Sequence, residues 1–246
     1  MGLPAAIINT AYVAAGVALF ATGEAPVLSP STDFLGNKLA VYCAGLKFSG
    51  CLYMALVNFG VGLRGGAATV LVLATAALNY YSAIEPVIGP LGKVFMVICL
   101  PIAALAFSGR LKLTGYCWAF YVVIIPSLFL SKGFAGDTVR GIFLAPEIEA
   151  VSDKFSMTWS LWAVSGWIHF VFHNIGVHNG LATFFAMNAY VLVDIYALFY
   201  TTDWTVLAYS FIALDGLMGG LGLHEYMNKN KPAGAAPRRS GRRKVR

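Results

Sequence analysis

Charged residues are scarce in this chain. Of its 246 residues, 11% are charged and 59% are hydrophobic, whereas a soluble domain is about 25% charged. So few charged side chains could not cover a water-facing surface of this size. Runs of about 20 predominantly apolar residues can cross a bilayer, and the chain contains many. The composition therefore predicts an all-α integral membrane protein in contact with the lipid bilayer.

Motifs of several common soluble sites are also missing from the sequence. The four cysteines lie inside apolar runs without a CxxC pair, which argues against a disulfide framework and a structural zinc site. No P-loop, no GxGxxG after a strand and no GxSxG motif is found, so nucleotide binding and serine hydrolysis have no support. No cofactor is predicted on these grounds.

Eight apolar segments predict about eight transmembrane helices. They cover residues 4–22, 39–63, 66–85, 89–107, 112–131, 155–178, 181–201 and 203–224. We divide the chain into a first four-helix unit with the span that closes it (1–131), an outer loop (132–154), the membrane helices of a second repeat (155–227) and a tail (228–246). The first segment lacks the positive start of a signal peptide, so we treat it as a span.

The tail sets the expected orientation. Residues 228–246 hold eight of the 17 Lys and Arg residues and no acid. This composition predicts a disordered basic segment on the cytoplasmic side, attracted to anionic headgroups. An even number of spans then places both termini there, and the acidic loops fall outside. Nucleic acid is an unlikely partner, and the membrane concerned stays open.

The sequence also contains an internal similarity. Shifted by 116 positions, Lys38–Gly62 aligns without gaps on Lys154–His178 with six identities in 25 residues, including Ser49-Gly50 with Ser165-Gly166. Four spans per unit would give both copies the same orientation in the membrane, as in transporters with parallel repeats. We therefore predict two parallel four-helix repeats.

Ionisable residues within the spans are candidate functional residues, because charge in lipid is costly. Lys47, Asp194 and Asp215 fall at depths where a lysine–aspartate pair can form. Two interpretations are open: an ion pair that locks the repeats together, or a leftover aspartate that exchanges protons. Trp159, Trp162, Tyr190 and Tyr196 could form belts near the span ends or line a pocket for an apolar ligand.

All four histidines map toward the inner face. His169 and His173 are four residues apart, a spacing that stacks two side chains on one helix face and suits two ligands of one metal ion. His178 and His224 lie at the inner ends of their spans. Hydrogen bonding of these imidazoles to backbone, water or each other is the simpler interpretation, so a metal ion is only a low-ranked alternative.

Three functions remain open from the sequence. The first is a polytopic protein that binds or transports a small or lipidic molecule, in one version linked to protons through Asp194 or Asp215. The second is a structural subunit of a larger membrane complex, with membrane-protein partners or a homo-oligomer. The third is a membrane-embedded enzyme acting on a lipid or isoprenoid substrate, so enzymatic activity stays undecided.

Overall fold

The computed structural model describes residues 2–60, 64–85, 87–130 and 154–229. This part of the chain contains eight α-helices and one short 3₁₀ helix, η3. They are α1 (Gly2–Thr22), α2 (Lys38–Phe59), α3 (Arg64–Ile84), α4 (Pro90–Phe107), α5 (Leu111–Leu130), α7 (Lys154–Ile175), α8 (Asn179–Tyr200), η3 (Val206–Ala208) and α9 (Tyr209–Lys229). The predicted outer loop, but for Lys154, and the tail from residue 230 lie outside the described residues.

Each of the eight predicted segments overlaps one of these helices, which confirms the all-α class. Five helical stretches are long and apolar enough to cross a membrane: Leu3–Thr22, Lys38–Phe59, Gly65–Ile84, Asn179–Tyr200 and Val206–Lys229. A shorter apolar stretch covers Lys93–Phe107. The last segment begins later than predicted, because a bend and η3 precede α9, whose first residue is Tyr209.

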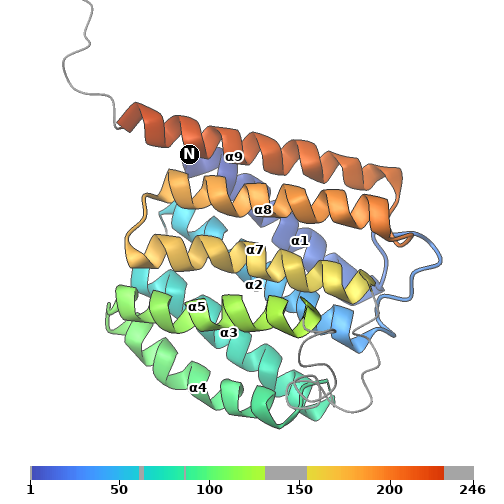
Figure 1. Cartoon of the computed structure of the whole chain (residues 1–246), viewed down its shortest axis with the longest axis horizontal. Helices are drawn as coiled ribbons and strands as arrows, with labels where there is room; N and C mark the ends of the chain where they lie inside the picture. Colours follow the sequence, from blue (N-terminus) through green and yellow to red (C-terminus); the bar gives the residue numbers. More distant parts are fainter. Residues whose placement is uncertain (1, 61–63, 86, 131–153, 230–246) are drawn as a thin grey trace, which may run out of the picture.

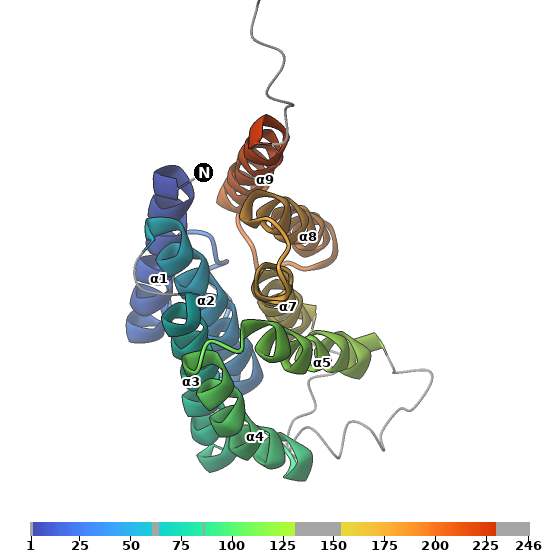
Figure 2. The same cartoon turned by 90° about the vertical axis from the view of Figure 1, so that its left-hand side faces the viewer.

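The helices run roughly side by side, and α2 and α7 form the centre of the bundle (Figures 1 and 2). On one side α2 packs against α1 and α3, and α3 packs against α4. On the other side α7 packs against α5 and α8, and α8 packs against α9. Contact between α2 and α7 joins the two halves. Both central helices are therefore shielded from lipid over most of their surface.

Two glycines allow this central contact. A Cβ atom placed on Gly50 of α2 would lie 3.3 Å from the Cα of Gly166 on α7, and a Cβ on Gly166 would lie 3.4 Å from the Cα of Gly50. Small residues let helix backbones approach closely in lipid, where packing drives helix association. The two SG steps that stand out in the sequence thus face each other across the bundle.

The distribution of polarity suits a lipid environment. Large apolar side chains are among the most exposed, including Phe107 at 81%, Val206 at 77% and Phe199 at 70% exposure. Many serines, threonines, asparagines and ionisable residues of α2, α7 and α8 are instead buried. Polar groups inside and apolar groups outside are what a membrane helix bundle requires, because lipid cannot form hydrogen bonds with the protein.

The segments that follow α1 and precede α9 are joined at one end of the bundle, called the outer end after the predicted orientation. Leu28 and Trp204 form an isolated antiparallel bridge. On either side of it, the Ser29 amide donates to the Asp203 carbonyl at 2.7 Å, and the Thr205 amide donates to the Val27 carbonyl at 2.9 Å. These bonds join the α1–α2 connection of the first half to the segment before α9 in the second half.

Candidate functional site

The structure brings together the three ionisable residues that the sequence singles out. Lys47 of α2, Asp194 of α8 and Asp215 of α9 are all buried, with 5%, 2% and 3% exposure. At 1.5 Å rise per residue, Lys47 lies about 14 Å from the outer start of its helix. Each aspartate lies about 9 Å from the outer end of its own helix. Because α9 starts at Tyr209, Asp215 is closer to the outer end than the sequence suggests, and the three groups share one layer.

The two carboxyl groups are held by aromatic hydrogen-bond donors. The Tyr12 hydroxyl of α1 donates to Oδ1 of Asp215 at 2.9 Å. Nε1 of Trp162 on α7 donates to Oδ1 of Asp194 at 2.8 Å. Among the described residues, the other carboxyl oxygen of Asp194, Oδ2, is buried and has no hydrogen-bond partner. Four helices therefore contribute to one buried acidic pair.

The Lys47 ammonium lies in an aromatic cage. Its Nζ atom is 4.2 Å from the centre of the Trp162 ring. Four further rings have their centres within 5.3–5.6 Å of Nζ; they belong to Tyr12, Phe48, Trp159 and Phe211. Attraction between a cation and an aromatic face is significant within about 6 Å of the ring centre. All five rings thus contribute to holding the ammonium.

The predicted lysine–aspartate ion pair is not present as a direct contact between the charged groups. Among the described residues, neither aspartate has a carboxylate oxygen within 4.0 Å of the Lys47 ammonium. The cage members Tyr12 and Trp162 donate to the carboxyl groups instead. The ammonium therefore contacts rings, and those rings connect it to the acids.

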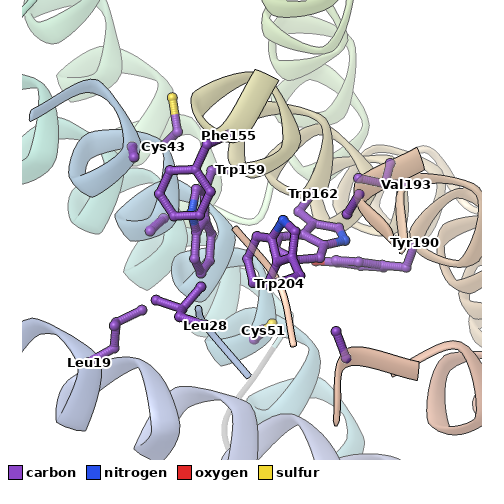
Figure 3. Close-up of a cluster of buried hydrophobic side chains, with 14 of the residues drawn as sticks. Leu19, Leu28, Cys43, Cys51, Phe155, Trp159, Trp162, Tyr190, Val193 and Trp204 are labelled. Atoms are coloured by element: carbon purple, nitrogen blue, oxygen red, sulfur yellow. The ribbon is translucent and has the colours of Figure 1, made fainter. Parts of the chain in front are cut away.

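Further tryptophans extend the cage toward the outer end. Ring centres of Trp159 and Trp162 are 5.1 Å apart, and Trp204 lies 4.8 Å from Trp162 and 5.6 Å from Trp159. Figure 3 shows these three rings together, with Tyr190 extending from α8 toward Trp162. Within the described part of the chain, the buried indole nitrogens of Trp159 and Trp204 have no hydrogen-bond partner. The three tryptophan rings pack against one another inside the bundle, whereas Tyr196 stacks on Tyr200 away from them.

The histidines form a separate group. His169 and His173 lie on one face of α7 with ring centres 5.7 Å apart. Nε2 of His169 is 3.0 Å from Oδ1 of Asn179, and Nδ1 of His173 is 2.9 Å from the Tyr53 hydroxyl. The i, i+4 spacing thus has the geometry expected of it, with polar partners on neighbouring helices.

The other two histidines lie at helix ends. Nδ1 of His178 accepts a hydrogen bond from the Gly180 amide at 3.1 Å and so caps the start of α8. His224, near the end of α9, lies within hydrogen-bond distance of Asn228. Over the described ranges, no three His, Cys, Asp or Glu side chains come together as metal ligands. Metal binding by these histidines stays a prediction.

Two surface pockets lie near α1, one at each end of this helix. The outer pocket, of about 590 Å³, is lined by residues of the α1–α2 connection and by Thr205. The second, of about 580 Å³, is lined by Leu3 and Pro4 of α1 and by residues 221–229 of α9. Between them, Tyr12 of α1 reaches Asp215 and packs edge-on against Phe211, both on α9. Neither pocket is lined by Lys47, Asp194 or Asp215.

Sequence reasoning missed Tyr12, Phe48 and Phe211 as parts of the site. Each lies in an apolar segment in which one more aromatic residue carries no signal of its own. Trp159 and Trp162 were recognised only as belt or pocket residues. The burial of Lys47 was the available clue, because a buried ammonium requires partners and aromatic faces are one kind.

No protein-family model, curated protein or solved structure matches this chain.

Proposed function

We propose that this protein binds a small molecule and carries it across a membrane in a process linked to protons. The observation that carries the proposal is the buried pair of Asp194 and Asp215 next to the caged Lys47. Ionisable groups inside membrane bundles are costly and mark pathways and proton relays. A site that served only to join helices would need one acid for one base, and this site has a second carboxyl group.

Proton exchange follows from the arrangement of the two acids. Two ionised carboxylates buried in one layer would repel each other, so the pair favours a proton on one of the acids. Such a pair holds one proton while no ligand is bound. It can release this proton when a positive charge approaches, because an opposite charge favours the ionised form. Tyr12 and Trp162 each donate to one carboxyl group, so both oxygens stay positioned whether the proton is present or not.

The location of the site supports movement of a ligand. It lies on the seam where Tyr12 of α1 meets Phe211 and Asp215 of α9, and a pocket is present at each end of α1. Contact between α1 and α9 consists largely of side chains, such as Tyr12 with Phe211. A seam held by side chains can open toward either end at smaller cost than the closely packed backbones of α2 and α7.

The proposal includes eight spans arranged as two parallel repeats. In support, the order of packing is the same in α1–α2–α3–α4 and in α5–α7–α8–α9. The halves lie on opposite sides of the α2–α7 contact (Figure 2). Gly50 and Gly166, which face each other there, are 116 positions apart. An axis along the membrane normal would relate the two units.

A second cluster supports the same duplication. Phe95 and Cys99 of α4 lie 116 positions before Phe211 and Asp215 of α9. The Tyr121 hydroxyl of α5 is 3.2 Å from the Cys99 sulfur, and its ring packs on Phe95, as Tyr12 does with Asp215 and Phe211. By this correspondence a cluster without a carboxyl group lies where α4 of the first half meets α5 of the second half.

Proteoliposomes loaded with a pH-sensitive dye test this function. Small ammonium ions, carboxylates, sugars and lipid headgroup alcohols are added outside, one class at a time. We expect at least one class to move protons in vesicles with wild-type protein, and Asp215→Asn to abolish the signal. Asp33→Asn, a change in an exposed loop, is the matched control. Absence of a signal for every class, or a full signal in Asp215→Asn, would contradict the proposal.

A further inference from the structure

The cage around Lys47 has features of a binding site for a cation. Five aromatic rings lie within 5.6 Å of the ammonium. Recognition of ammonium ligands by aromatic cages uses this arrangement, because each ring presents its negative face to the positive charge. Lys47 is 5% exposed, and none of the hydrogen bonds or ion pairs of the described residues involves its ammonium. The rings are therefore its main partners.

The acids place negative charge next to this cage. Trp162 and Tyr12 each contact the ammonium through their ring and hydrogen-bond an acid through their polar atom. A cation in the cage thus lies near two carboxyl groups that Lys47 alone cannot neutralise when both are ionised. One more positive charge, either a proton or a second cation, is needed to neutralise the second carboxylate.

We propose that the cage is the binding site of an organic ammonium ion, and that the Lys47 ammonium occupies this site until the ligand displaces it. The inference rests on the proposed function for its location and names the class of the ligand. In the closed state, Lys47 balances one carboxylate, and a proton neutralises the other acid. When the organic cation enters, the O–H bond breaks and the proton leaves to water. Two cations then face two carboxylates, so one monovalent ligand exchanges for one proton.

A tethered occupant competes with a free ligand. Its effective concentration in such a site is in the millimolar range for a short flexible link, so removal of the tether should strengthen ligand binding. Truncation of Lys47 to alanine removes Cγ, Cδ, Cε and Nζ, a fragment with the shape of n-propylammonium. This probe therefore matches the space that Lys47→Ala opens between the five rings.

The test measures binding of n-propylammonium to purified full-length protein by calorimetry and by tryptophan fluorescence. We expect Lys47→Ala to bind it at least tenfold more tightly than wild type. We further expect 1-propanol, which has the same chain without the charge, to bind neither protein. Lys93→Ala removes an exposed lysine of α4 and should behave like wild type. Lys47→Met, which keeps an apolar chain in the cage, should gain no affinity.

The outcomes separate this inference from the proposed function. Equal binding of n-propylammonium to Lys47→Ala and wild type, or equal binding of 1-propanol and n-propylammonium to Lys47→Ala, would overturn it. If Lys47→Ala folds only with n-propylammonium present, the inference is supported; if the probe does not restore folding, it is overturned. A proton signal in vesicles for carboxylates or sugars alone would refute the cation site and keep the transport function. Tight binding of the probe without any proton signal would keep the cation site and refute the transport function.

Discussion

The contact between Gly50 and Gly166 predicts opposite effects for two Gly→Ala substitutions. In Gly50→Ala, the new methyl group would lie 3.3 Å from the Cα of Gly166 and 3.5 Å from its carbonyl carbon. Carbon atoms prefer separations of about 3.5–4.0 Å, so α2 and α7 must separate by a few tenths of an ångström. Overpacking of this kind costs roughly 1–3 kcal/mol. In Gly220→Ala on α9, the methyl group meets nothing within 4 Å.

Both substitutions remove the same helix penalty of glycine, about 1 kcal/mol. We therefore expect Gly220→Ala to be stabilised by up to about 1 kcal/mol and Gly50→Ala to be less stable than it by roughly 1–3 kcal/mol. Unfolding in detergent, followed by tryptophan fluorescence, gives the comparison. Separation of α2 from α7 also moves Lys47 away from Trp162, so the tryptophan spectrum of Gly50→Ala should change before unfolding. If Gly50→Ala were as stable as Gly220→Ala, the close packing described for the central pair would be wrong.

Three further predictions concern buried hydrogen bonds and the histidines. Tyr12→Phe removes a hydrogen bond to a carboxyl group and should lower the free energy of unfolding by about 1.5–3 kcal/mol, whereas Tyr116→Phe, on an exposed ring, should change it little; equal losses would contradict the assignment. Tyr53→Phe removes the hydroxyl that contacts His173 and accepts from Asn174 and should cost about 1–3 kcal/mol, and part of this loss should remain when His173 is already alanine. Metal analysis of purified wild type beside the double variant His169→Ala/His173→Ala should give the same metal content, because no third ligand adjoins the pair in the described residues; a stoichiometric metal lost in the variant would refute this.

Prediction of the helices succeeded because it depends on local features. A bilayer requires about 20 apolar residues per span, and that requirement can be read from consecutive residues. The start of α9 was the main error of position. Residues 203–208 are apolar enough to belong to the span, but their backbone pairs with the α1–α2 connection through Leu28 and Trp204. Contacts between distant segments of this kind leave no local pattern.

The candidate site was predictable only in part. Lys47, Asp194 and Asp215 stand out because each is an ionisable residue in an apolar segment, and burial of charge has a cost that calls for partners. Their depths could be estimated from the helix rise. The groups that surround the lysine could not be predicted, since Tyr12, Phe48 and Phe211 look like ordinary lipid-facing residues in the sequence.

The sequence by itself determined the helical class of this protein, the apolar segments long enough to cross a membrane and the ionisable residues that need buried partners, because composition and hydrophobic length are local quantities. Only the tertiary structure decided that Lys47 lies among five rings, that Tyr12 and Trp162 hold the two acids, and that His169 and His173 have polar partners on neighbouring helices. Those outcomes depend on how α1, α2, α7, α8 and α9 rotate against one another. The rotation is set by close contacts such as Gly50 with Gly166, which form between residues far apart in the chain.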